Sequence, residues 1–208
     1  MRQATTIAAV VGVLAGLAAC GSSDSTTAAA NGTLVVQLTD APFSADSIGR
    51  VDIFVVRIDG RLADADSATA AKGATSDSAS MSGWKTLAAP NLGVNMLSYQ
   101  SGQSLALGQA SVPAGSYMGF RIVIDPSKSS ITLKNGIVMT GTSTPSASFP
   151  SGGTSGLKIQ LTTPVVVAAN GTTTMVVDFD VANSFVLRGS SLSLNGLLFK
   201  PVIRASVK

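Results

Sequence analysis

Three aspartates stand at positions where their carboxylates can converge. Asp178 and Asp180 flank Phe179 at the end of an expected strand, and residues two apart on a strand point to the same side. Asp40 lies in the segment 38–42, which reads LTDAP, and can join them. Because a hard cation binds several oxygen ligands, the three residues form a candidate Ca²⁺ site. The structural alternative is that Asp40 caps its own turn, while the other two bind backbone N–H groups or arginines.

Three arginines are candidate partners for these acids, namely Arg121, Arg188 and Arg204. Arg121 interrupts an apolar strand, and Arg204 lies in the last expected strand. Their alternative roles are structural ion pairs or a solvated face.

One motif resembles a catalytic signature. Residues 155–158 read SGLK and match S-x-x-K, the acylation motif of penicillin-binding enzymes, but they straddle a Gly-rich loop and an alternating strand. Neither S-D-N nor K-T-G occurs, and the chain contains no histidine, so no Ser–His or Cys–His relay can be built. A hydrolase using paired aspartates remains an alternative, although nothing marks such a pair in a cleft. The sequence predicts a protein that is not an enzyme and that has no cofactor apart from the Ca²⁺ considered above.

Trp84 and Tyr117 are candidates for a sugar-stacking platform. Aromatic residues make up only 5% of the chain, so few are available for both the core and a binding face. We expect both side chains to pack in the core instead.

The N-terminus has the features of an export signal. Met1 and Arg2 form a short positive region, and residues 5–19 form an apolar run that suits a signal-peptide core. The run ends in Leu-Ala-Ala directly before Cys20, the only cysteine in the chain. This ending resembles the lipobox of bacterial lipoproteins, in which the cysteine is acylated and becomes the mature N-terminus.

The resemblance implies a signal peptide over residues 1–19, a lipidated Cys20 with a flexible tether over 20–32, and a folded domain over 33–208. Membrane attachment would then occur through the N-terminal lipid. Gly21 stands where an Asp usually retains a lipoprotein at the inner membrane, so we expect the outer membrane of a Gram-negative bacterium. The alternative is an ordinary signal peptide followed by a chance cysteine.

The charge pattern argues against nucleic-acid binding. The net charge is only +3, charged residues make up 12% of the chain, and no run of three or more Lys or Arg occurs. Phosphate binding requires clustered cations, so we expect no nucleic-acid partner.

Alternating apolar residues and turn signals predict an all-β domain. Three Asn-Gly pairs, at 135–136, 170–171 and 195–196, predict type I′ hairpins and therefore antiparallel pairing. Met118, Phe120, Ile122 and Ile124 are expected to share one face of their strand. The expected strands lie at 33–39, 51–58, 105–112, 117–124, 157–161, 172–179, 192–194 and 197–207.

Two low-complexity stretches predict surface loops. Residues 60–83 are rich in Ala, Ser, Thr and Asp and read as a long loop or insertion, and residues 141–156 read as a shorter one. No second domain or internal repeat is expected.

An ordered set of short motifs resembles a known family. The set resembles a domain of unknown function that is common in bacterial lipoproteins and archaeal surface proteins and that opens with L-T-D-A-P, over about residues 32–206. That family looks like the transthyretin-like and carboxypeptidase-regulatory-like folds. The resemblance implies an antiparallel Greek-key β-sandwich of about seven strands, and no activity. The motifs are LTDAP (38–42), WKTL (84–87), VPAGSY (112–117), SGLK (155–158), DFD (178–180) and KPVIR (200–204).

These observations lead to one main functional hypothesis. The protein is expected to be a non-enzymatic, lipid-anchored module of the cell envelope, a scaffold, adhesion or interaction domain whose partner is a protein or a glycan. The alternative is an envelope lipoprotein that binds a small ligand or Ca²⁺ through the three aspartates.

Overall fold

The computed structural model describes residues 30–40, 47–63, 83–150 and 152–208. Over these residues the chain forms fifteen strands, two short 3-10 helices and two four-residue α-helices. The prediction of an all-β fold is confirmed. The strands are β1 (Asn31–Asp40), β2 (Ile48–Leu62), β3 (Trp84–Ala88), β4 (Leu92–Asn95), β5 (Leu105–Pro113), β6 (Gly115–Ile124), β7 (Ser130–Leu133), β8 (Val138–Met139), β9 (Ala147–Ser148), β10 (Leu157–Leu161), β11 (Val165–Val167), β12 (Thr172–Phe179), β13 (Phe185–Leu187), β14 (Leu197–Phe199) and β15 (Ile203–Val207). The helices are η2 (Met96–Tyr99), η3 (Pro126–Lys128), α2 (Val181–Ser184) and α3 (Leu192–Asn195).

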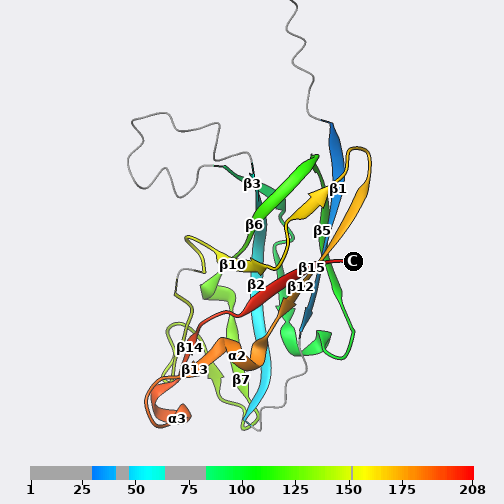
Figure 1. Cartoon of the computed structure of the whole chain (residues 1–208). Coiled ribbons are helices and arrows are strands. Elements are labelled where there is room, and N and C mark those ends of the chain that lie inside the picture. Colours follow the sequence, from blue (N-terminus) through cyan, green and yellow to red (C-terminus); the bar gives the residue numbers. More distant parts are fainter. Residues whose placement is uncertain (1–29, 41–46, 64–82, 151) are drawn as a thin grey trace, which may run out of the picture.

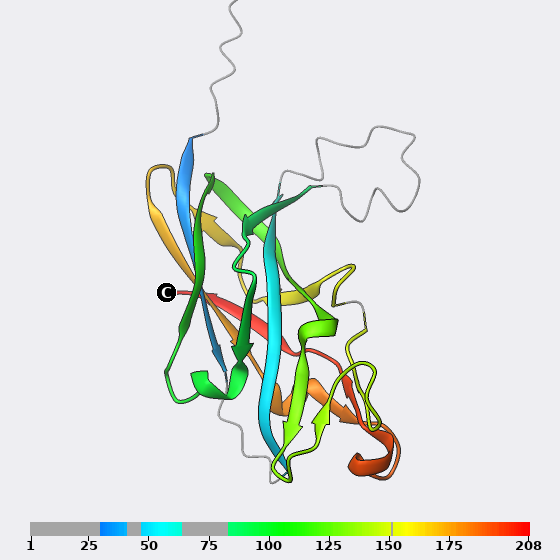
Figure 2. The same cartoon turned by 180° about the vertical axis from the view of Figure 1, so that it is seen from behind.

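Most strands form one continuous hydrogen-bonded path, in the order β5-β1-β12-β15-β10-β6-β2-β7-β8. Strands β3 and β4 also pair with β2, and β11 pairs with β6. The path folds back on itself, so that its β5-β1-β12-β15 half faces its β6-β2-β7 half (Figures 1 and 2). A small sheet of β13, β14 and β9 lies at the end where β7 also lies (Figure 1).

Two details of the predicted architecture were wrong. The described residues contain fifteen strands rather than about seven, because short strands such as β8, β9 and β11 form where none was predicted and the expected strand 197–207 is divided into β14 and β15. Pairing is also not purely antiparallel, since β1 with β12, β10 with β15, and β14 with β9 run parallel. Hairpin signals report only on neighbours in the sequence, whereas parallel pairs need long connections that carry no such signal.

The Asn-Gly pairs do not form type I′ turns, which need positive φ at both residues. Within the three pairs, φ is positive only at Gly136 (88°), Asn170 (57°) and Gly196 (74°). The first pair does connect an antiparallel hairpin, β7 with β8. Gly196 instead ends α3, where its N–H donates to the carbonyl of Leu192.

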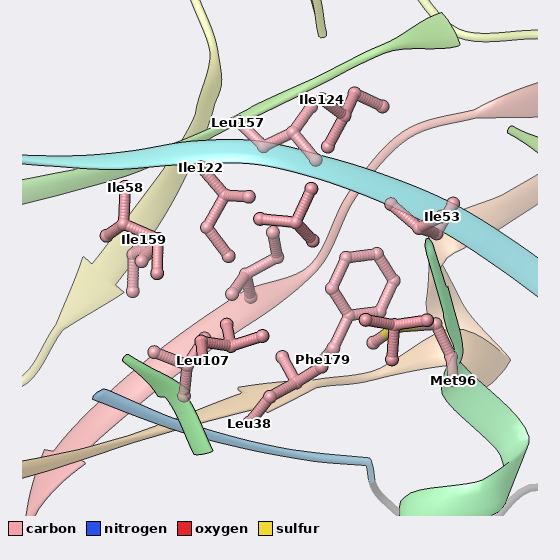
Figure 3. Close-up of a cluster of buried hydrophobic side chains, with 14 of the residues drawn as sticks. Leu38, Ile53, Ile58, Met96, Leu107, Ile122, Ile124, Leu157, Ile159 and Phe179 are labelled. Atoms are coloured by element: carbon pink, nitrogen blue, oxygen red, sulfur yellow. The ribbon is translucent and has the colours of Figure 1, made fainter. Parts of the chain in front are cut away.

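The core lies between the two halves of the sheet. Leu34, Val36 and Leu38 alternate along β1 and are each 1% exposed, as their spacing predicts. Figure 3 shows side chains of the two halves meeting, with Ile53 and Ile122 on one side and Phe179 on the other. Burial of this apolar surface is the main stabilising term of the fold.

Strand β6 contains a bulge that changes its face. The register with β2 shifts between Arg61 and Leu62, so Tyr117 turns inward and is 1% exposed, whereas Met118 is 60% exposed. The expectation that Met118 shares the buried face was therefore wrong, because an inserted residue breaks the two-residue period. The Tyr117 hydroxyl donates to the carbonyl of Pro113 at 3.0 Å and secures the turn at which the chain passes from one half of the sheet to the other.

The predicted loops are partly structured. β2 continues to Leu62, beyond the expected loop start at residue 60, and residues 64–82 lie outside the described part of the chain. The stretch 141–156 contains β9 and the buried Phe149. β1 begins at Asn31, two residues before the predicted start of the domain. No helix among the described residues has the length and apolarity of a membrane span.

Candidate functional site

Asp40, the last residue of β1, is 3% exposed. Its Oδ1 accepts a hydrogen bond from the backbone N–H of Val181 at 3.1 Å, and its Oδ2 accepts one from Nε2 of Gln100 at 3.1 Å. Burial raises the pKa of Asp40 to about 6; the two hydrogen bonds lower it, and the charges of Asp178 and Asp180 raise it. The carboxylate therefore joins the end of β1 to the residue after η2 and to the start of α2.

The other two predicted ligands take structural positions. Asp180 is the N-cap of α2, where Oδ1 accepts from the backbone N–H of Asn183 at 3.1 Å and Oδ2 accepts from Nδ2 of the same residue at 2.8 Å. This arrangement agrees with the structural alternative. Asp178 lies in β12, opposite Thr39 of β1 and Arg204 of β15. Among the described residues no three acidic side chains are arranged as metal ligands, and the Ca²⁺ site stays a prediction.

A buried ionic cluster lies on the outer face of β2 and β6. Asp59 is 2% exposed and Arg121 is 4% exposed, and their Oδ2 and Nε atoms are 2.9 Å apart. Oδ1 of Asp59 also accepts from Nε of Arg57 at 3.1 Å and from the hydroxyl of Thr86 at 2.9 Å. The Arg121 guanidinium donates further to the carbonyl of Ser155 at 3.2 Å. Arg121 therefore forms a structural ion pair with Asp59, as the alternative interpretation predicts, and Asp59 is not one of the three candidate site aspartates.

Two segments cover this cluster from outside. Trp84 of β3 lies against Arg121, whose guanidinium carbon is 4.7 Å from the ring centroid. Gly156 lies on the other side, where an added Cβ would meet Arg121 Cδ at 3.1 Å and Val123 at 3.2 Å. Trp84 thus packs on the outer face and is only half-buried, so its predicted core position was wrong. Tyr117 does lie in the core.

The strand register aligns the charged side chains in rows. Lys158 of β10, Arg121, Asp59 and Thr86 follow one another across four strands. Arg61 lies in the next row, between Gly119 and Trp84, and Arg57 lies opposite Val123. In these rows of described residues, the basic side chains of Arg57, Arg61, Arg121 and Lys158 lie around the carboxylate of Asp59. A shallow cavity of about 280 Å³ opens at the edge of these rows, lined by Arg61, Leu62, Ala63, Trp84, Met118 and Gly119.

A second feature is an apolar end formed by α2, β13, α3 and β14. Leu194 is 76% exposed, Val186 44% and Leu187 43%. Leu187 also lines a cavity of about 380 Å³, whose other apolar lining residues include Ile48, Val181, Phe185, Leu192 and Leu197. The apolar end lies opposite the end where β1 begins (Figures 1 and 2).

The remaining candidates are separated from these features. Nη1 of Arg188 donates to the hydroxyl of Ser146 at 3.2 Å, which is not one of its predicted acidic partners. Arg204 is exposed on β15. Ser155 lies in a loop and Lys158 lies in strand β10, so the S-x-x-K motif straddles a loop and a strand, as predicted.

Sequence reasoning missed the acid at the centre of the cluster. Arg57 and Asp59 stand two residues apart near the end of an apolar strand, a spacing that places both on one face. Together with Arg121 in a second apolar strand, that spacing was the available signal. The apolar end was also missed, because its residues come from four short elements that meet only in the folded chain.

The predicted lipidation site, Cys20, and the predicted signal peptide and tether up to residue 29 lie outside the described residues. These predictions therefore depend on the sequence alone.

Comparison with known families identifies the folded part of the chain. The model for "Domain of unknown function (DUF4382)" matches residues 31–201, which covers nearly all of the described residues. No curated protein and no solved structure gives a match. The expectation of a domain of unknown function is confirmed.

Proposed function

Because the chain belongs to the DUF4382 family, whose function is not defined, we propose a role from its own features: a non-enzymatic, lipid-anchored module of the cell envelope that binds a partner at its apolar end. The partner would be a protein or a glycan on the far side from the anchor. The observation that carries this proposal is the exposed apolar end with its cavity of about 380 Å³.

The N-terminal sequence supports the anchor. The apolar run and the cysteine at residue 20 have the order of a lipoprotein signal, and two or more acyl chains make a stable anchor. A flexible segment between Cys20 and β1 would span about 20 Å. The outer membrane of a Gram-negative bacterium is the proposed location, from Gly21.

The apolar end supports partner binding. Leu194, Val186 and Leu187 are exposed on α3 and β13, and Leu187 lines a cavity that has mainly apolar walls. Exposed apolar clusters on soluble domains commonly mark interaction sites. Because this end lies opposite the start of β1, an anchor at the N-terminus would leave it accessible (Figure 1).

The fold is proposed to be a transthyretin-like, Greek-key sandwich. Two features support this assignment: the two packed halves of the sheet, and the Pro113-Ala114-Gly115 turn that joins β5 in one half to β6 in the other. Such a scaffold would present its loops and ends for binding and implies no catalysis.

The proposal is tested in intact envelopes with a photo-crosslinking residue at position 194 and, as matched control, at the exposed position 207. We expect adducts from position 194 that Leu187→Ser reduces, and none from position 207. Mass spectrometry should find an acylated Cys20. The Cys20→Ala variant should no longer be retained in the envelope fraction. An unmodified cysteine or a retained leader would overturn the anchor, and equal labelling at both positions would overturn the apolar end as the binding site.

The alternative function is binding of a small ligand or Ca²⁺ at Asp40. The observation that favours it is the proximity of Asp178 and Asp180, whose charges both act on the buried Asp40 carboxylate. Millimolar Ca²⁺ should then raise the melting temperature, and Asp40→Asn should remove the increase. If Ca²⁺ leaves the melting temperature of both proteins unchanged, Ca²⁺ binding at Asp40 is ruled out.

A further inference from the structure

The chain carries the same reactive dipeptide, Asn-Gly, at 135–136, 170–171 and 195–196. An asparagine side chain is readily attacked by the backbone nitrogen of a following glycine, because glycine has no Cβ to crowd that nitrogen. The fold does not use these pairs as type I′ turns, and it places each of them in a different setting. The structure therefore decides which of the three pairs can react.

The reaction is deamidation, and its only co-reactant is water. The backbone nitrogen of the glycine loses its proton and forms a bond to Cγ of the asparagine. The bond from Cγ to Nδ2 then breaks and ammonia leaves, which gives a succinimide ring. Water opens the ring at either carbonyl carbon, and the product is aspartate or isoaspartate. The glycine nitrogen must first rotate toward Cγ, so a peptide group that is held in place reacts slowly.

One constraint is common to the three pairs. The glycine N–H donates a hydrogen bond to a carbonyl three or four residues earlier, at 2.9 Å for Gly136 and at 3.1 Å for Gly171 and Gly196. This bond must open before the nitrogen can attack. The differences between the pairs therefore come from their other contacts.

The pair at 195–196 is held on both sides. Oδ1 of Asn195 accepts from the backbone N–H of Ser191 at 3.1 Å, and Gly196 is buried. The carbonyl of Gly196 accepts from the N–H of Arg188 at 3.1 Å, and an added Cβ on this glycine would collide with the carbonyl of Ser146. Rotation of this peptide group would therefore disrupt the packing around α3 and β14.

The pair at 170–171 is bound to β1. The backbone N–H of Asn170 donates to the carbonyl of Asn31 at 2.8 Å, and the carbonyl of Gly171 accepts from the N–H of Thr33 at 2.8 Å. These two bonds lie where the parallel pairing of β1 with β12 begins. The nitrogen of Gly171 cannot rotate toward Cγ without detaching the start of β1.

The pair at 135–136 lies in the hairpin between β7 and β8, and both residues are exposed. An added Cβ on Gly136 would have no described atom within 4 Å. Oδ1 of Asn135 accepts from the N–H of Ile137 at 3.2 Å, so the oxygen that gains charge during the attack already has a donor. β8 pairs with β7 over only two residue pairs at the end of the sheet path, so this hairpin opens at low cost.

From this comparison we infer that Asn135 is a modification site, at which the folded protein deamidates spontaneously, and that the fold protects Asn170 and Asn195. The site depends only on the hairpin and on the reactivity of the dipeptide. It does not depend on the proposed function.

The modification would place a carboxylate beside the apolar end. Asn135 lines a cavity of about 330 Å³ together with Lys134 and Leu192, and Leu192 also lines the cavity of the apolar end. A new charge at this position makes the neighbourhood of the proposed binding site less favourable for an apolar partner. Deamidation would thus weaken partner binding as the protein ages, and this consequence rests on the proposed function.

The reaction is measured on the purified protein in mildly alkaline buffer made with heavy-oxygen water. Each deamidation during the incubation then labels the new carboxyl group, and peptide mapping by mass spectrometry follows the three pairs separately. We expect Asn135 to react at least about tenfold faster than the other two, a ratio that a small difference in opening free energy produces. Faster reaction at Asn170 or Asn195, or three equal rates, would overturn the inference.

Incubation in urea is the control for the effect of the sequence alone. The contacts that distinguish the three pairs are lost in the unfolded chain, so their rates should become similar. A preference for Asn135 that persists unchanged in urea would show that the neighbouring residues set it, and the structural argument would be wrong. Asn135→Gln should abolish the labelled product at this position, because the longer side chain must close a larger ring. Circular dichroism verifies that the variant is folded.

A second measurement tests the consequence for binding. Asn135→Asp carries the charge of the product from the start, and Asn135→Gln is the matched neutral variant. With the photo-crosslinking residue at position 194, Asn135→Asp should give fewer adducts than Asn135→Gln. Equal adducts would overturn the effect on binding and leave the modification site standing. If the parent protein forms no adducts at all, the proposed function fails, and the rates of deamidation still decide the inference.

Discussion

At the scale of single residues, the environment of Asp40 determines its chemistry. The side chain is buried and accepts two hydrogen bonds, yet burial still raises its pKa to about 6 from 3.8. In the unfolded chain the group titrates near 3.8, so between these values only the folded state holds the extra proton. The stability that protonation contributes is fully present below pH 3.8 and is lost as the pH rises through 6.

Asp40→Asn should therefore make the free energy of unfolding at pH 7 higher than that of the parent, by about 2 to 3 kcal/mol at most. The amide can still accept from the Val181 N–H, and the Gln100 amide can turn over to accept from Asn. Near pH 4 the two proteins should be about equally stable. Urea unfolding at several pH values between 4 and 7 measures the difference.

Asp125→Asn is the matched control, and the pH dependence of its stability difference from the parent should have the opposite sign. Hydrogen bonding from Ser127 lowers the pKa of Asp125, so its charged form stabilises the fold above pH 3.8 and this contribution is lost as the pH falls. A stability difference between parent and Asp40→Asn that does not change with pH would contradict the account of Asp40.

At the scale of elements, one acid holds three strands together. Asp59 of β2 binds Arg121 of β6 and Thr86 of β3, and Trp84 and Gly156 lie against Arg121. The cluster lies on the face of the sheet away from the main core, where apolar packing contributes less. Its hydrogen bonds satisfy a buried charge that would otherwise destabilise the sheet.

Asp59→Asn should lower the free energy of unfolding by about 3 to 5 kcal/mol, because it removes the carboxylate charge that pairs with the buried Arg121. The matched control is Asp52→Asn, which removes the exposed ion pair with Arg50 and should cost less than about 1 kcal/mol. Equal losses in the two variants, measured by urea unfolding, would show that the outer-face cluster does not support the sheet.

At the scale of the whole molecule, the elements of the apolar end lie opposite the end where β1 begins (Figures 1 and 2). An anchored chain would enter the fold at the start of β1, far from β13, α3 and β14. This separation would leave the apolar end accessible to a partner, and it depends on the long path of the sheet between the two ends.

Local patterns predicted part of this structure. The alternation of Leu34, Val36 and Leu38 was enough to predict the buried face of β1. The same reasoning failed at Met118, because a bulge is set by pairing with β2 and leaves no trace in the alternation. Likewise, nothing in the sequence distinguishes Asp59 from an ordinary charged strand residue. Only the pairing of β2 with β6 places Arg121 beside it.

The amino-acid sequence by itself determined the all-β class, since composition and two-residue periodicity are local properties. Only the tertiary structure decided the parallel pairing of β1 with β12, the Asp59–Arg121 cluster and the apolar end. These features join residues far apart in the chain. Their partners are selected by packing and charge in the folded state, and no local pattern encodes that selection.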